Sequence, residues 1–238
     1  MNKAAKDAKK EILYYTPEQV ALHNAPEDLW VSFLGHVYNL SPLALQYENS
    51  PLLGPILRAG GSDISHWFDP ATGDLLMQTN PLTGCKTPYT PDGRFLHVPP
   101  PLPRSDWNPC ELDQTPWWLE HSKYRIGTLS TKTRKVIIVN TLTQQSCTLT
   151  VCGEEAIIAI QDRYLAYNSH AKGYMWKRQG TLLDMNATLE ENGMPDQAKQ
   201  FERAGMNEDE WLPVIHLYFR YARVFTFHFI SSDDLTIA

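Results

Sequence analysis

The stretch from Tyr47 to Asp69, YENSPLLGPILRAGGSDISHWFD, contains residue types that raise the question of an iron site. It carries a tyrosine, a pair of glycines and the triplet His66-Trp67-Phe68. Phenolate oxygen and imidazole nitrogen both serve as ligands of haem iron. The stretch lacks the paired ligands that mark a metal site in a sequence. It therefore indicates either an unusual iron site or the remnant of one.

The composition predicts one or two folded domains. Of the 238 residues, 42% are hydrophobic and 20% are charged, which is enough for a packed core. The formal net charge of -6 argues against a nucleic-acid partner. No apolar run approaches the ~18 residues that a membrane span needs, so we expect no membrane partner. The four cysteines form no CxxC pair, which favours free thiols in a reducing compartment: Cys85, Cys110, Cys147 and Cys152.

Proline and tryptophan concentrate in residues 81–122. Proline removes a backbone donor and clashes with the preceding turn, so this segment cannot form a long helix. We predict an extended, partly polyproline connector, pinned onto a surface by its Trp and Phe side chains. Its run VPPPLP is a rigid linker or a ligand for a polyproline-binding domain. The predicted division is a solvated arm without a secretory signal (1–13), a first domain (14–80), the connector (81–122), a second domain (123–220) and a C-terminal extension (221–238).

Short local signals order the first domain. Thr16 followed by Pro17 predicts a helix N-cap with proline at the first helical position. Two short strands are expected around a Leu34-Gly35 turn. A second helix should begin with Ser41 as its N-cap, and further short helices should follow before Asp69.

The sequence YTPEQVALHNAPEDLWVSFLGHVYNLSPL resembles the opening of the cytochrome b5 haem-binding domain. The shared pattern is a Tyr-Thr start, a helix that ends in His-Asn, a Trp in the next strand and the run VYNLSPL. The run AGGSDIS, followed by an aromatic residue, resembles the second signature of that family. The resemblance covers about residues 14 to 80 and implies an α+β domain with a cradle for haem.

Both histidines that hold haem in that family are missing. Ser50-Pro51-Leu52-Leu53 stands at about the place of the family's His-Pro-Gly-Gly motif, and DPATGD stands where the second histidine is expected. A related branch, the membrane-associated progesterone-receptor-like proteins, uses a tyrosine ligand. The resemblance therefore implies Tyr47 as a candidate axial ligand of haem iron, with His66 as the nearest histidine. Otherwise Tyr47 is a half-buried core residue and His66 is a packed or hydrogen-bonded histidine, so haem b is an optional cofactor.

The second half has the element order of a β-grasp domain. The runs KVIIVNTL and SCTLTV predict two strands, and the spacing of Ile157, Ile160 and Leu165 predicts a helix after them. A strand, a short strand, one helical turn and the final strand PVIHLYFRY follow. WKRQGTLLDMNATLEENGM resembles part of ubiquitin, and the chain ends in DDLTIA without the Gly-Gly tail that conjugation needs. The alternating Phe225, Phe227 and Phe229 predict one more strand, packed on this domain or on a partner.

No catalytic motif is found, so we expect a protein that is not an enzyme. A cytochrome b5-like domain, a Pro/Trp-rich connector and a ubiquitin-like domain together resemble a family of axonemal cytochrome b5 domain-containing proteins. The resemblance implies a place in the cytoplasm and cytoskeleton, in the axoneme of a cilium or flagellum. It also implies radial spoke subunits as partners in a large hetero-oligomeric assembly. We therefore expect a structural or regulatory subunit that acts by protein docking; the alternatives are a haem-binding redox or electron-transfer protein and, third, an adaptor of the ubiquitin pathway.

Overall fold

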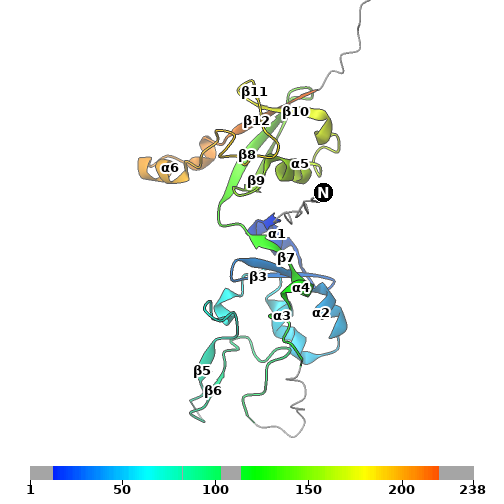
Figure 1. Ribbon diagram of the computed structural model, residues 1–238, viewed down its shortest axis with the longest axis vertical. Coiled ribbons are helices and arrows are strands. Elements are labelled where there is room, and N and C mark those ends of the chain that lie inside the picture. Colours follow the sequence, from blue (N-terminus) through cyan, green and yellow to red (C-terminus); the bar gives the residue numbers. More distant parts are fainter. Residues whose placement is uncertain (1–12, 82, 103–113, 220–238) are drawn as a thin grey trace, which may run out of the picture.

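The structure, a computed structural model, describes residues 13–81, 83–102 and 114–219. These residues form two lobes that follow one another along the long axis of the molecule (Figure 1). Each lobe is built around its own five-stranded sheet and its own cluster of buried side chains. No helix in the described ranges is long and apolar enough to cross a lipid bilayer.

The first sheet has the strand order β1 (Tyr14–Tyr15), β7 (Arg125–Leu129), β4 (His36–Asn39), β3 (Asp28–Phe33) and β2 (Asn24–Ala25). Strand β1 pairs with β7 in parallel, and the other neighbours are antiparallel. Four short helices belong to this half: α1 (Pro17–Leu22), α2 (Ser41–Gln46), α3 (Gly54–Arg58) and α4 (His121–Tyr124). A separate hairpin joins β5 (Met77–Thr79) to β6 (Lys86–Pro88), at the lower end of the molecule in Figure 1.

Local chemistry explains where the first elements begin. The Thr16 hydroxyl accepts the backbone N–H of Gln19, and the Gln19 side chain accepts the backbone N–H of Thr16, a complete capping box. The predicted turn is also present, because Leu34 and Gly35 both have positive φ angles between β3 and β4. The predicted N-cap at Ser41 is wrong. Ser41 is the first helical residue, and its hydroxyl instead accepts the backbone N–H of Leu29 at 2.9 Å.

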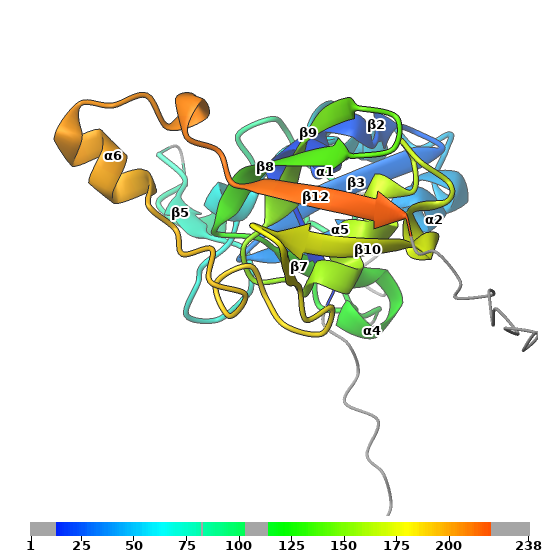
Figure 2. The same cartoon turned by 90° about the horizontal axis from the view of Figure 1, so that it is seen from above.

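The second sheet has the strand order β11 (Thr181–Leu182), β10 (Tyr174–Arg178), β12 (Val214–Phe219), β8 (Thr133–Asn140) and β9 (Gln145–Cys152). β8 and β9 form an antiparallel hairpin, helix α5 (Ile157–Tyr164) follows, and β12 returns in parallel beside β8. This is the β-grasp topology, so the predicted α+β fold class is confirmed. Between β11 and β12 the chain carries helix α6 (Ala198–Ala204), which projects to one side of the lobe (Figures 1 and 2).

The boundary between the two lobes differs from the predicted one. Residues 125–129 were expected in the second domain, but they form β7 inside the first sheet. Gly127 permits this pairing, because a Cβ atom there would lie 2.5 Å from the carbonyl oxygen of Leu13 and 2.6 Å from the Tyr15 ring. The second sheet begins only at Thr133.

The predicted connector is part of the first core rather than a strap on its surface. Phe95, Trp117 and Trp118 are at most 3% exposed and belong to the same buried cluster as residues of β3, α2 and α3. These three side chains therefore contribute to the apolar surface that the first lobe buries. The predicted strand with the alternating Phe residues, in 221–238, and residues 1–12 lie outside the described residues.

Candidate functional site

Tyr47, the first predicted iron ligand, lies at the end of α2 and is half-buried. Its hydroxyl is 3.5 Å from Nε2 of His97, and the two rings meet edge to face with centroids 5.9 Å apart. A distance of 3.5 Å is at the outer limit of a hydrogen bond. The Tyr47 hydroxyl thus meets a side chain from residues 81–122, which is 50 positions away in the sequence.

His97 is held in one orientation by a second contact. Its Nδ1 atom accepts the backbone N–H of Trp117 at 3.0 Å, and its own backbone has a φ of 67°. A neutral imidazole whose Nδ1 accepts must carry its proton on Nε2. His97 therefore presents an N–H to the Tyr47 oxygen.

His97 was not among the predicted site residues. It is one of two histidines in residues 81–122, and both meet a tyrosine of the first domain. The other, His121, lies with Nδ1 3.0 Å from the Tyr38 hydroxyl. Both contacts span more than 40 positions of the chain, so no local pattern reports them.

A cavity of about 290 Å³ lies beside the Tyr47–His97 pair. Its lining includes Leu43, Tyr47, His97, Glu120, Lys123 and Tyr124. Sites for small molecules and cofactors usually have volumes of about 300–1,000 Å³, so this cavity is just below that range.

His66, the second predicted ligand, lies in a different environment. It belongs to a single helical turn, Ser65–Trp67, and its side chain is exposed. The described cavity beside Tyr47 does not include it. The structure therefore does not bring the two predicted ligands together at one described cavity, and the assignment of either as an iron ligand stays a prediction.

Aromatic side chains fill much of the interior of the first lobe. We refer to six of them as the aromatic cluster: Phe33, Trp67, Phe68, Phe95, Trp117 and Trp118. Phe33 stacks on Phe68 with centroids 4.4 Å apart, and Trp67 stacks on Phe95 at 4.9 Å. Trp117 meets Trp118 edge to face at 5.6 Å. Such offset and edge-to-face pairs are the favoured arrangements of aromatic rings.

The described residues do not fit a haem held between two axial side chains. Tyr47 and His66, the two predicted ligands, do not line one described cavity. The interior of the lobe is occupied by the aromatic cluster, three of whose members come from residues 95–118. Tyr47, with His97 beside it, is a single candidate ligand at the rim of this core.

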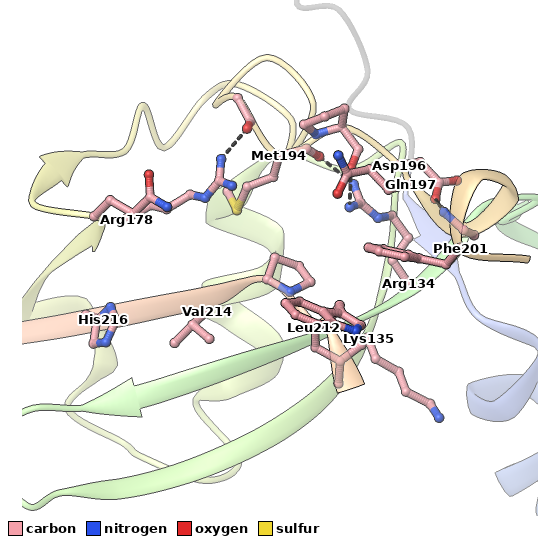
Figure 3. Close-up of a pocket in the computed structure, with 16 residues that line it drawn as sticks. Arg134, Lys135, Arg178, Met194, Asp196, Gln197, Phe201, Leu212, Val214 and His216 are labelled. Carbon is pink, nitrogen blue, oxygen red and sulfur yellow. Dashed lines mark hydrogen bonds between the residues drawn. The ribbon is translucent and has the colours of Figure 1, made fainter. Parts of the chain in front are cut away.

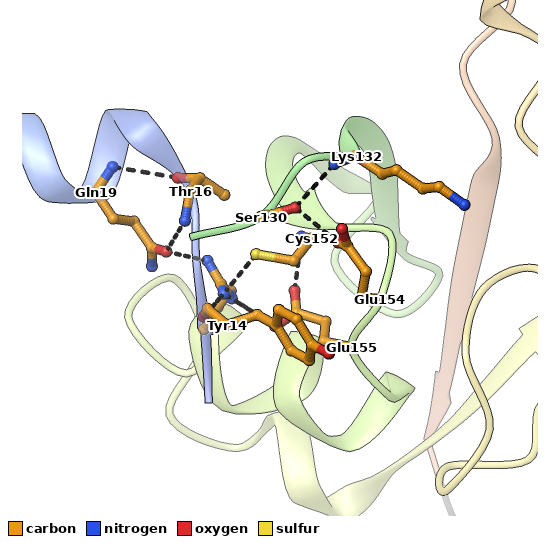
Figure 4. Close-up of polar contacts among 9 residues, drawn as sticks. Tyr14, Thr16, Gln19, Ser130, Lys132, Cys152, Glu154 and Glu155 are labelled. Carbon is orange, nitrogen blue, oxygen red and sulfur yellow. Dashed lines mark hydrogen bonds and ion pairs between the residues drawn. The ribbon is translucent and has the colours of Figure 1, made fainter. Parts of the chain in front are cut away.

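A second polar site joins the two lobes, and its centre is Arg163 on α5. Figure 4 shows Tyr14, Gln19, Cys152 and Glu155 gathered at this site. Its guanidinium pairs with the Glu155 carboxylate at 2.9 Å and donates to the backbone oxygen of Tyr14 at 2.8 Å. It also donates to the Gln19 side chain in α1 and, at 3.2 Å, to the Cys152 sulfur. One arginine of the second lobe therefore holds two segments of the first.

Burial and hydrogen bonds shift the pKa values of the acidic groups around Arg163. Burial, with the Glu155 charge nearby, raises the pKa of the Cys152 thiol to about 11. Burial also raises the pKa of Glu155, although Arg163 opposes the shift. The pKa of Glu154 is lowered, because hydrogen bonds from Ser130 and Thr131 outweigh the effect of burial. Cys152 is thus a protonated structural thiol rather than a reactive one.

Comparisons with known proteins agree with this two-lobe architecture. Residues 16–130 match the family described as cytochrome b5-like heme/steroid binding domain, a range that includes β7. The chain is 52% identical over 223 residues to human cytochrome b5 domain-containing protein 1, covering 94% of this chain and 91% of that protein. The protein of the same name from Xenopus laevis is 50% identical, with 94% and 96% covered.

Two solved structures that resemble part of this chain are ubiquitin-like. Caldiarchaeum subterraneum ubiquitin is 17% identical, with 39% of this chain and 99% of that chain covered and a TM-score of 0.29. An N-terminal ubiquitin-like domain solved in solution is 13% identical, with 39% and 80% covered and the same TM-score. The β-grasp assignment of the second lobe rests on its strand order. From its identity to relatives over nearly their whole length, the chain belongs to the cytochrome b5 domain-containing protein 1 family.

Proposed function

We propose that the protein is a non-catalytic structural or regulatory subunit of the ciliary axoneme, associated with radial spokes, and that it acts by docking to other proteins. The resemblance to axonemal cytochrome b5 domain-containing proteins supports the location. Two small folds of a kind that commonly bind other molecules, joined through a polar contact at Arg163, support the mode of action.

The aromatic cluster is the observation that carries the non-catalytic part of this proposal. Trp117 and Phe95 have no exposed surface, and both pack against side chains of the cytochrome b5-like domain. A packed protein interior leaves few voids larger than a water molecule. Side chains of this chain therefore occupy the interior of a domain that, in its family, is built around a prosthetic group.

Fractionation of motile cilia tests the docking role. Detergent removes the membrane and matrix, and mild salt then extracts the axonemes. We expect the protein to stay with the axoneme after detergent and to leave it together with radial spoke proteins. Recovery in the soluble matrix alone would count against the proposal.

Haem-binding redox or electron transfer is the second candidate function. The observation in its favour is the Tyr47 hydroxyl beside an oriented His97 at a cavity, within a domain whose family is described as heme/steroid binding. A phenolate that binds iron would gain a hydrogen bond from Nε2 of His97.

A haemin titration of the full chain decides between the two candidates. Under the docking proposal we expect no Soret shift beyond that of haemin with an unrelated protein. A saturable shift that disappears in Tyr47→Phe would establish a haem site at Tyr47. His66→Ala and His97→Ala, measured in parallel, would show which histidine contributes.

A further inference from the structure

A groove of about 530 Å³ lies in the second lobe, between the sheet and the loop that carries α6 (Figure 3). Its lining includes Arg134, Arg178, Asp196, Phe201, Trp211 and His216. The sheet contributes one wall through β8, β10 and β12, and residues 193–213 contribute the other. Neither the cytochrome-like cavity nor the contact at Arg163 is part of it.

The groove is positively charged in a chain of net charge -6. Arg134 donates to the carbonyl oxygens of Met194 and Pro195 at 2.7 and 2.9 Å, and Arg178 donates to that of Gly193. Carbonyl oxygens orient a guanidinium without neutralising it. No carboxylate within the described ranges forms an ion pair with either arginine.

Asp196, the acidic side chain in the groove lining, forms no ion pair with either arginine among the described residues. The Asp196 carboxylate accepts the backbone N–H of Ala198 at 3.1 Å, close to where α6 begins. Lys135, which also lines the groove, pairs with Asp209 outside it at 2.9 Å. Two oriented, unneutralised guanidinium groups are thus left along one wall.

An apolar surface faces the same groove. The Trp211 side chain is 58% exposed, and Phe201 is partly exposed on α6. Helix α6 buries none of its residues against the rest of the lobe. Tryptophan and arginine are the residues most enriched at the energetic centres of protein interfaces.

We infer that this groove docks an acidic segment of a partner protein that also carries a large apolar side chain. Carboxylates of the segment would face Arg134 and Arg178, and its apolar side chain would pack on Trp211 and Phe201. A nucleic acid fits less well, because the chain as a whole repels phosphate. The inference rests on the proposed docking function and names its surface and the chemistry of its partner.

Fluorescence anisotropy of a labelled peptide made of glutamate and leucine, titrated with the full chain, tests this inference. We expect saturable binding that weakens as salt is raised. Trp211→Ala should weaken it roughly tenfold or more. Arg178→Gln should weaken it and flatten its dependence on salt.

Matched variants separate the groove from general effects. Tyr167→Ala removes another exposed aromatic side chain of the same lobe, and Lys132→Gln removes another cation outside the groove lining. Both should bind like the wild type. Circular dichroism of every variant shows whether the lobe is folded, and Trp211→Ala tests the inference even if Arg178→Gln disturbs the loop.

Several outcomes would overturn the inference. These are no binding, equal binding of a lysine and leucine peptide, unchanged binding in folded Trp211→Ala, or complete competition by inorganic phosphate. Binding that appears only after Asp233→Asn and Asp234→Asn would identify the chain's own end as the occupant. If the wild-type chain stays with axonemes but does not bind the peptide, the groove assignment is wrong and the docking function still stands. If the chain is recovered in the soluble matrix, the docking function itself is contradicted.

Discussion

The two lobes bury their cores in different ways. The core of the second lobe is drawn from residues 136–217, mostly aliphatic side chains on strands and α5 that follow one another in the chain. The core of the first lobe combines residues 29–75 with side chains from 95–124, and aromatic rings dominate its centre. The core of the second lobe is therefore built mostly from regular elements. The core of the first lobe also needs side chains from an irregular segment that packs back against its sheet and helices.

This difference shows what the proline-rich segment does. A flexible spacer could be altered freely, because loops tolerate changes that cores do not. Trp117 and Phe95 are fully buried, and His97 holds the backbone N–H of Trp117. These residues of the segment are thus a structural part of the cytochrome b5-like domain. Substitutions at them should destabilise that domain and not the β-grasp domain.

The largest expected effect comes from Trp117→Ala. Removal of a buried Trp side chain costs about 3–5 kcal/mol of the free energy of unfolding. Hydrogen exchange followed by mass spectrometry should show lost protection in residues 28–39, which form β3 and β4, with residues 133–152 unchanged. Equal loss in both lobes would contradict the division drawn between them.

Trp117→Phe is the matched control for that change. The indole N–H of Trp117 has no hydrogen-bond partner among the described residues, so phenylalanine gives up no polar contact. Changes that keep most of the volume of a core side chain usually cost less than about 1.5 kcal/mol. A loss in Trp117→Phe as large as in Trp117→Ala would show that ring burial is not the main contribution.

Arg163→Ala should have the next largest effect, and it tests how the lobes are joined. Loss of one partner of a buried ion pair costs about 3–5 kcal/mol, and we expect the lower end because the Arg163 side chain is 13% exposed. The protease sensitivity of residues 129–133 should rise in this variant, because Gln19 and Tyr14 lose their contact with the second lobe. Arg163→Lys should lie between wild type and Arg163→Ala. Unchanged cleavage would mean that other contacts hold the lobes together.

A smaller effect is expected from the pH dependence of stability through Cys152. The folded protein keeps the thiol proton up to a pKa of about 11, whereas the ordinary value is 9.0. The unfolded chain therefore loses this proton first, and the free energy of unfolding should fall as pH rises from about 9 towards 11. Over this range the urea midpoint of the wild type should fall relative to that of Cys152→Ala, which has no thiol at this position. Cys85→Ala, at an exposed thiol, should follow the wild type.

The smallest effect is expected from Tyr47→Phe. The Tyr47–His97 contact is 3.5 Å long, so its loss should cost under about 1 kcal/mol. His97→Ala should cost more, because the buried backbone N–H of Trp117 then loses its acceptor. Comparison of their urea midpoints measures this order. A larger loss in Tyr47→Phe than in His97→Ala would assign Tyr47 a role beyond this contact.

Much of the fold could be predicted from local signals in the sequence. The helix N-cap at Thr16, the turn at Leu34-Gly35 and the strands and helix of the second lobe are where their patterns indicated. Each of these elements is set by residues within a few positions of one another. The resemblance to cytochrome b5 and ubiquitin depended on the same short runs, and the family it implied is the one to which the chain belongs.

The candidate site could be predicted only in part. Tyr47 was predicted as a candidate ligand and stays one, whereas its contact His97 lies 50 positions away in a segment that has no helical or strand period. For the same reason residues 125–129 were placed in the second domain, since a short local sequence does not say which sheet it joins.

Residue types and their spacing alone determined the two kinds of domain and the absence of the usual haem histidines. Only the tertiary structure decided that Phe95, Trp117 and Trp118 lie inside the first lobe. The physical reason is that the burial of an irregular segment depends on the space that distant elements leave for it. That space exists only once the sheet and helices have come together.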